Sequence, residues 1–429
     1  MCTDRRDFLR LSAGIAGATL LGSSLVHAHE ESFEPPQQGN VPEPIRQLRR
    51  MTENVVPITL DERKARIEKA QKLMREKRVD SIFLEPGSSM FYFTGMRWGT
   101  SERMFAVVIP ARGEIAWVCP KFEEERAREL IKMGNDIRTW EEDESPYKRV
   151  AEIFKDRGIR TGTIGIEERM RFFLYDGVRL VAPQLKFVDA TPVTAGCRMY
   201  KSPTELALMQ IANDITIVAY KATRDSMREG MTQAEFAGNC SAAFRALGTS
   251  RGIFVSFGKY TAFPHGSSTP QRLKEGDVVL MDGGCSVDGY QSDITRTFVF
   301  GKATDRQRQI WDLERKAQDA GFAAAKVGAP CEAVDAAARK VITDAGFGPD
   351  YKVPGLPHRT GHGIGLDGHE WTNFVRGNKT PITPGMCFSD EPTVVIYGEF
   401  GIRLEDCLYI TPDGPKFFTK QSESIDEPF

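Results

Sequence analysis

The positions of its histidines constrain this chain more than any other feature. The sequence contains six histidines, and the four outside the first 29 residues are His265, His358, His362 and His369. The same stretches carry a set of carboxylates, namely Asp282, Asp293, Asp367, Glu391 and Glu405. Imidazole is the commonest nitrogen ligand of transition metals, and carboxylates suit harder divalent ions. We therefore expect a fold that brings segments far apart in the sequence together at one metal site.

The first 29 residues have the pattern of an export signal. Arg5 and Arg6 form a twin-arginine pair, an apolar stretch rich in Ala and Gly covers 11–26, and small residues precede a cleavage site at 26–28. The apolar stretch is about 16 residues long, shorter than the roughly 20 that a membrane-spanning helix needs. We expect a bacterial twin-arginine signal peptide at 1–29, and a periplasmic or secreted mature protein without an integral membrane segment.

Composition limits the remaining classes of protein. About 400 mature residues exceed what a single hydrophobic core usually supports, so two domains are expected. A net charge of −2 provides no basic surface for nucleic acid. Seven cysteines follow Cys2 without a CxxC pair or regular spacing, so we expect buried free thiols rather than a disulfide framework, including Cys285 and Cys387.

The segment before the first domain is rich in proline. Residues 30–57 contain five prolines, which exclude a regular helix or central strand and indicate a linker or a surface-hugging arm. Thr59 and Glu62 then form a capping box at the start of a helix. Strand-like runs at 81–84, 105–109 and 114–119 alternate with helical stretches such as 123–133. The pattern predicts an α/β domain over 58–195.

A second domain is expected over 200–429. Ser202 with Glu205 and Thr232 with Glu235 are capping boxes that begin two helices before a strand region. Two more helices, expected at 304–327 and 331–345, precede a second strand region. This repeated order of helices and strands suggests an α+β domain with an internal structural repeat.

The first chemical motif places two acids around a tight turn. Asp288-Gly289 predicts a two-residue hairpin loop, which sets position 284 opposite 293. Asp282 and Asp293 then become diagonal neighbours on one face, roughly 7–8 Å apart at the backbone, and can reach a shared pair of cations. Surface acids on a solvated hairpin are the alternative, but Asp282 follows four apolar residues, and a buried acid needs compensation.

The second motif, residues 358–370, contains three histidines among glycines. No Lys-Ser/Thr follows, so a phosphate-binding loop is not indicated, and the glycines more plausibly let the backbone approach a crowded site. The third motif reads as two strands with a turn at 397–399, whose pairing brings Glu405 next to Glu391. Arg403 points the same way as Glu405 and can orient or partly neutralise it; an ordinary cross-strand salt bridge is the alternative.

Residues 200–415, together with the sequence Met90-Phe91-Tyr92-Phe93-Thr94-Gly95 in an α/β domain, resemble the pita-bread metallopeptidases, in the aminopeptidase P and prolidase branch. The resemblance implies a creatinase/prolidase-like N-terminal domain and a pita-bread catalytic domain. It also implies a homodimer and substrates that are di- or oligopeptides with proline after the cleaved bond.

By this resemblance five residues bind two divalent ions. Asp282 would chelate one ion, Asp293 and Glu405 would bridge both, and His362 and Glu391 would hold the second. The resemblance implies manganese, with cobalt or zinc also suited to such a site. Such a pair lowers the pKa of a bridging water and polarises the scissile carbonyl, with Glu391 as proton shuttle. The resemblance further assigns His265 to assistance at the substrate, His369 to stabilisation of the oxyanion and His358 to the substrate pocket, with Arg403 behind the ligands.

Two activities remain open. An aminopeptidase would act on longer Xaa-Pro peptides, whereas a dipeptidase must bind the free carboxylate of its substrate. Arg376 is a candidate to bind that carboxylate, although an arginine in a polar loop is more often simply solvated. The sequence departs from the family at Asp390, where a hydrophobic residue is usual, and at Thr393, where glycine is usual. A non-peptide metal enzyme, lyase or amidinohydrolase-like, and a non-catalytic binding module are further alternatives, although retention of all five ligands argues against loss of activity.

Overall fold

The computed structural model describes residues 41–429. The signal peptide predicted at 1–29 and residues 30–40 of the proline-rich arm lie outside the described residues. None of the helices described in residues 41–429 is long and apolar enough to cross a bilayer.

The described part of the arm contains one short helix, α2 (Glu43–Arg46), contrary to the expectation of no helix there. Prolines fit the start of a helix because the first N–H groups have no partner within the helix, and Pro42 and Pro44 occupy the cap and first turn. Ile45 is buried, and the Met51 N–H donates to the Leu247 carbonyl at 2.9 Å. The arm therefore lies on the surface of the C-terminal domain, which was one of the two predicted alternatives.

The N-terminal domain is built on a six-stranded mixed sheet of order β4-β3-β2-β1-β5-β6. Its strands are β1 (Ser81–Leu84), β2 (Ala106–Pro110), β3 (Ala116–Pro120), β4 (Asp136–Trp140), β5 (Thr163–Ile166) and β6 (Lys186–Asp189). The first three confirm the predicted runs. The sheet is accompanied by α3 (Leu60–Lys77), α4 (Ser88–Thr94), η2 (Lys121–Glu123), α5 (Glu124–Leu130), α6 (Pro146–Asp156), α7 (Phe172–Val181) and α8 (Thr191–Arg198).

The helix predicted over 123–133 is shorter, because Ile131 adopts extended backbone and ends α5 at Leu130. The capping box of Thr59 and Glu62 is present in both directions at the start of α3. Central strands β1, β2 and β3 are buried on both faces, which explains why they read as continuous apolar runs.

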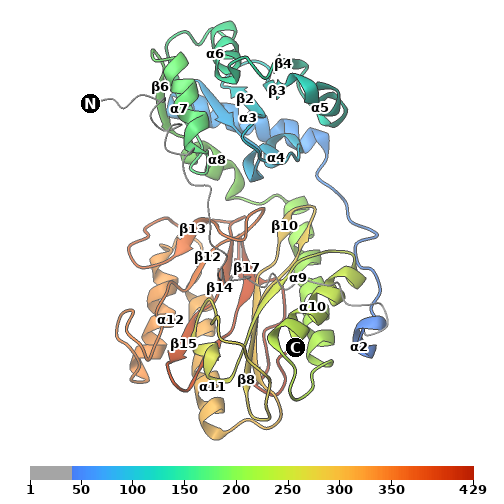
Figure 1. Cartoon of the computed structure of the whole chain (residues 1–429). Helices are drawn as coiled ribbons and strands as arrows, with labels where there is room; N and C mark the ends of the chain where they lie inside the picture. The colour runs from blue at the N-terminus through green and yellow to red at the C-terminus, as the bar shows by residue number, and fades with distance from the viewer. Residues whose placement is uncertain (1–40) are drawn as a thin grey trace, which may run out of the picture. The chain divides into compact units, whose positions relative to one another are not determined.

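The C-terminal domain has two pairs of helices, each followed by strands (Figure 1). The helices are α9 (Pro203–Arg224), α10 (Gln233–Leu247), α11 (Asp305–Ala324) and α12 (Glu332–Asp344). The capping boxes predicted for α9 and α10 are both formed, and Thr304 with Gln307 forms another at α11. The predicted order of helices and strands is confirmed.

Strands from both halves supply the site. The first half contributes β7 (Ile253–Phe257), η3 (Gly258–Ala262), β8 (Val278–Gly283), β9 (Ser286–Val287), β10 (Tyr290–Gln291) and β11 (Ile294–Val299), with sheet order β11-β8-β7. The second contributes β12 (Gly361–Gly363), β13 (Glu370–Phe374), β14 (Cys387–Asp390), β15 (Thr393–Ile396), β16 (Phe400–Arg403), β17 (Asp406–Thr411) and β18 (Gly414–Phe417). A backbone bridge between Thr295 and Glu405 joins the two halves.

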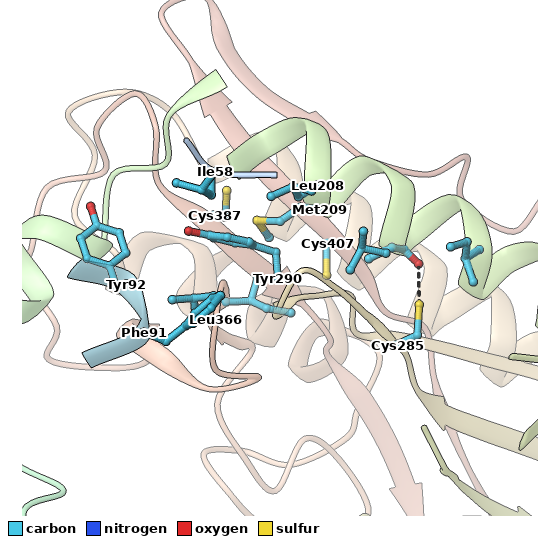
Figure 2. Packing of buried hydrophobic residues seen from close by; sticks show 14 of the residues in the cluster. Ile58, Phe91, Tyr92, Leu208, Met209, Cys285, Tyr290, Leu366, Cys387 and Cys407 are labelled. Carbon is cyan, nitrogen blue, oxygen red and sulfur yellow. Dashed lines mark hydrogen bonds between the residues drawn. The ribbon is translucent and has the colours of Figure 1, made fainter. Parts of the chain in front are cut away.

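The main hydrophobic cluster runs beside the hairpin β9–β10. Figure 2 shows Tyr290 of this hairpin packed with Met209, Leu366 and other buried side chains. Cys285 and Cys387 belong to the same cluster, and all seven cysteines in the described residues are free and buried. This confirms the prediction that the thiols are not a disulfide framework.

Candidate active site

The hairpin that carries the two aspartates has the predicted register. Val287 pairs with Tyr290 across the loop Asp288-Gly289, whose φ angles are 46° and 89°. Both residues are left-handed, as a two-residue loop of this kind requires. The same register continues to Asp282, which pairs with Thr295. Asp282 and Asp293 are therefore brought together by the hairpin, as the Asp-Gly turn predicted.

A first group of possible metal ligands consists of Asp282, Asp293 and Glu405, whose ligand atoms lie within 4.8 Å of one another. The Thr295 hydroxyl lies between the halves, 2.7 Å from Glu405 Oε2 and 3.1 Å from Asp282 Oδ1. We did not predict Thr295 as a site residue from the sequence, although the predicted register of the hairpin already places it opposite Asp282.

A second group consists of His362, Glu391 and Glu405. His362 Nδ1 lies 3.1 Å from the Gly363 carbonyl, so that nitrogen carries the proton. Nε2 then faces the acids, 3.1 Å from Glu391 Oε1 and 3.9 Å from Asp293 Oδ2. An imidazole oriented by a backbone carbonyl, with its other nitrogen among carboxylates, has the arrangement of a metal ligand.

Two glycines let strand β12 approach its neighbours. A Cβ at Gly361 would lie 2.1 Å from the Ser389 carbonyl oxygen, and one at Gly363 would lie 2.5 Å from the Trp371 carbonyl oxygen. Close backbone approach, as expected, explains the glycines around His362. The strand partners of β12 therefore decide where the imidazole sits.

The third motif forms the predicted pair of strands, with a different partner for its arginine. Ile396 pairs with Phe400, and Asp390 pairs with Asp406, which places Glu391 opposite Glu405. Arg403 donates to Asp282 Oδ2 and to Thr295 Oγ1 rather than to Glu405, the acid that we expected it to orient. The side chain of Arg403 is 4% exposed, so it holds Asp282 from behind the site.

The acids of the site perturb one another. Burial and the charge of Asp282 raise the pKa of Asp293, and burial with Asp293 raises the pKa of Glu405 well above its usual range. Burial also acts to raise the pKa of Glu391, but His362 outweighs it and the pKa is lowered. Glu405 Oε1 is buried without a hydrogen-bond partner in the described part of the chain. Converging acids, one imidazole and this unpartnered oxygen form a donor set that fits two divalent cations.

Three other histidines surround this donor set. His369 is exposed as a whole residue, but its ring packs against that of His362, with 3.9 Å between the centroids. Partial burial, His362 and Arg359 together lower its pKa to about 4, so it is neutral near pH 7. His358 has a buried Nε2 with no partner among the described residues, and burial lowers its pKa. His265 lines an open cavity of about 480 Å³ beside β7.

Arg376 lies outside these groups. It forms an ion pair with Asp350 at 2.8 Å, and its side chain is 52% exposed. This is the ordinary solvated arrangement that was the alternative to reading a substrate carboxylate. Asp367, the remaining carboxylate of the region, binds Arg198 and Arg169.

The unusual acid Asp390 does not join the metal ligands. It is fully buried in β14, and Gly321 of α11 lies against it, since a Cβ there would be 2.8 Å from Asp390 Oδ1. Neither carboxylate oxygen has a partner within residues 41–429, and burial raises its pKa well above the usual value. Successive strand residues face opposite sides, so Asp390 points to α11 when Glu391 points to the site. The Thr393 hydroxyl donates to the Ile402 carbonyl at 2.9 Å.

Comparison with known proteins agrees with this arrangement. Residues 207–412 match the family described as "Metallopeptidase family M24", and residues 66–200 match the family described as "Creatinase/Prolidase N-terminal domain". The chain is 32% identical over 365 residues to the Xaa-Pro dipeptidase of Lactobacillus helveticus, covering 84% of this chain and 98% of that protein. The chain belongs to metallopeptidase family M24.

Solved structures show the same two-domain fold. The dipeptidase PepE from Mycobacterium ulcerans superposes with a TM-score of 0.79 at 29% identity, over 86% of this chain and 99% of that one. The prolidase from Thermococcus sibiricus gives a TM-score of 0.76 at 28% identity, over 83% and 96%. This M24 peptidase therefore has an α/β N-terminal domain followed by an α+β pita-bread catalytic domain, as the sequence predicted.

Proposed function

We propose that this M24 peptidase is a dinuclear-metal exopeptidase that hydrolyses Xaa-Pro bonds. The observation that carries the proposal is the convergence of Asp282, Asp293, His362, Glu391 and Glu405 from three motifs far apart in the sequence. Relatives named Xaa-Pro dipeptidase, matched over nearly their full length, support a dipeptidase over an aminopeptidase for long peptides. A bond to proline has a tertiary amide and a restricted ring, so a dedicated pocket is needed to cleave it.

Each residue has a defined task in this proposal. When bound, a divalent pair lowers the pKa of a shared water and polarises the scissile carbonyl. Glu391 accepts the proton of the attacking water. His369 donates to the developing oxyanion, and His265 contacts the substrate from the side of β7. His358 lies beside the ring of the substrate proline.

Three further proposals concern the setting of the enzyme. The carboxylate-rich donor set with one imidazole supports Mn²⁺ as the native ion, with Co²⁺ or Zn²⁺ as substitutes. The Arg5-Arg6 pair and the apolar stretch that follows support export through a twin-arginine signal to the periplasm or medium. Resemblance to the family supports a homodimer. Cell fractionation of the wild type and of an Arg5→Lys, Arg6→Lys control tests export. Light scattering tests the homodimer.

The test of function uses purified, metal-stripped enzyme reloaded with Mn²⁺. We expect about two ions per chain by metal analysis, rapid hydrolysis of Gly-Pro, slower hydrolysis of a longer Xaa-Pro peptide, and none of a non-proline control. Asp293→Ala should lose metal and most of its kcat/KM, because one of the residues that would hold the ions is removed. Arg179→Met is a matched control in the N-terminal domain, where Arg179 pairs with Asp176, and should keep full activity.

Two results would contradict the proposal. Activity that survives metal stripping and Asp293→Ala would exclude the dinuclear mechanism. A metal-loaded enzyme that cleaves no proline peptide would favour a small-molecule lyase or amidinohydrolase on the same site, or a binding protein without activity.

A further inference from the structure

We propose that Arg359 is a positioning residue that fixes the orientation and tautomer of His369. The inference rests on the proposed function, since it concerns how the histidine is prepared to donate to the reacting group. It starts from one contact, in which Arg359 Nη2 lies 3.1 Å from His369 Nδ1.

The chemistry of the two groups decides the direction of this hydrogen bond. A guanidinium has only donors, so Nδ1 of His369 must accept. A neutral imidazole that accepts at Nδ1 carries its proton at Nε2. Arg359 therefore selects the one tautomer in which His369 Nε2 is a hydrogen-bond donor, as stabilisation of an oxyanion requires.

The backbone of Arg359 is held rigidly. Its carbonyl lies 2.6 Å from His358 Nδ1, and the His358 carbonyl accepts from Arg339 Nη2 at 2.8 Å. On the other side, Thr360 N and Oγ1 donate to Asp335 Oδ1 at 3.1 and 2.9 Å. Asp335 and Arg339 are themselves a buried ion pair on α12. Because β12 starts two residues later, the same anchored segment carries both this arginine and the ligand His362.

Arg359 is also available for this task. Within residues 41–429 it forms no ion pair, whereas Arg403 binds Asp282 and Arg376 binds Asp350. No other side chain in that range bonds to the His369 ring. Without the Arg359 donor, no hydrogen bond from a described side chain would select one neutral tautomer of this ring, and both would be populated.

The experiment compares three substitutions in the full-length, metal-loaded enzyme. Arg359→Met removes the donor and should lower kcat about 10- to 100-fold, the usual effect of losing an orienting partner, with KM and metal content nearly unchanged. Arg359→Gln keeps an N–H donor and should recover part of the lost kcat, and Arg359→Lys should do the same. Arg179→Met is the matched arginine control and should leave kcat unchanged, because Arg179 is paired with Asp176 on α7 of the N-terminal domain.

A second readout does not depend on activity. Ring ¹⁵N shifts of Zn²⁺-loaded, ¹⁵N-histidine-labelled enzyme report the tautomer, and a His369→Asn variant assigns the resonance. We expect the Nε2–H tautomer of His369 in the wild type and in Arg359→Gln, and averaged tautomers in Arg359→Met.

The outcomes separate the two proposals. An unchanged kcat and tautomer in Arg359→Met would overturn the inference. A raised KM at constant kcat, abolished when the substrate carboxylate is amidated, would instead make Arg359 a substrate-binding residue and also overturn it. A wild-type enzyme inactive on every proline peptide would refute the proposed function, while the ring shifts would still test the role of Arg359.

Discussion

Buried acids near the site differ sharply in their bonding. Glu370 follows His369, and its side chain is 5% exposed. It accepts from the N–H groups of Leu366 and Asp367 at 2.9 and 3.1 Å, from Arg198, and from Lys201 Nζ at 2.9 Å. Asp390 is as deeply buried but has no partner in residues 41–429. The donors around Glu370 lower its pKa, whereas burial raises the pKa of Asp390 well above its usual value.

Glu370 should make stability depend on pH. Burial acts to raise its pKa, but Lys201 and Arg198 outweigh it and lower the pKa from 4.5 to about 2. A lowered folded-state pKa stabilises the fold above the unfolded value, and this stability is lost as pH falls from about 4.5 towards 2. The shift corresponds to about 3 kcal/mol.

Urea unfolding of the wild type and Glu370→Gln between pH 3 and 7 measures this effect. The difference in free energy of unfolding should be largest at pH 6–7 and shrink as pH approaches 3. Parallel pH curves for the two proteins would show that the ion cluster does not stabilise the fold.

At the scale of elements, the site depends on how strands meet. The hairpin β9–β10 sets Asp282 and Asp293 on one face, and the pairing of β14 with β17 sets Glu391 opposite Glu405. Strand β12 inserts His362 from between β13 and β14, with glycine where the chains approach most closely. A single added methyl group therefore tests this arrangement.

Gly361→Ala should destabilise the protein by about 1–3 kcal/mol, because its Cβ would overlap the Ser389 carbonyl and force β12 away from β14. The displaced His362 should also weaken metal binding. Gly238→Ala is the matched control, since no atom lies within 4 Å of the added Cβ inside helix α10. It should stabilise the protein by about 0.5–1 kcal/mol. Thermal unfolding measures the stability of each variant, and metal titration measures its metal binding. Equal effects of Gly361→Ala and Gly238→Ala would contradict the close approach of β12 to β14.

At the scale of the whole molecule, metal binding should couple the two halves of the catalytic domain. Asp282 and Asp293 come from the first half, and His362, Glu391 and Glu405 come from the second. Without cations, the converging acids repel one another, as the raised pKa values of Asp293 and Glu405 indicate.

Saturating Mn²⁺ should raise the melting temperature of the stripped wild type by about 5 °C or more, because an ion that binds only the folded state stabilises it by mass action. The increase should be larger at pH 8 than at pH 6, since the raised pKa of Asp293 makes protons compete with the ions. Asp293→Asn should lose most of the increase. Calorimetry with and without chelator measures it, and an equal increase in the variant would place the ions elsewhere.

Local features could be predicted from the sequence because they depend on nearby residues. The capping boxes at Thr59 and Ser202 and the loop at Asp288-Gly289 are formed by residues a few positions apart, and the hairpin loop alone fixed the register of Asp282 and Asp293. The turn expected at 397–399 also predicted that strand pairing would bring Glu405 next to Glu391. Family resemblance added the roles that these residues are expected to have.

Only the tertiary structure decided the partners of long side chains. Arg403 could reach either Glu405 or Asp282, and the packing of the two halves brings it to Asp282, to which it donates a hydrogen bond. Arg359 and Glu370 show no pattern of their own in the sequence, because their partners depend on how the chain folds around His369. The sequence by itself determined the carboxylates and the imidazole that converge and the turns that bring them together, but not Thr295. Packing between distant segments decided what orients each of them, because a flexible charged side chain bonds to whichever group the fold brings within reach.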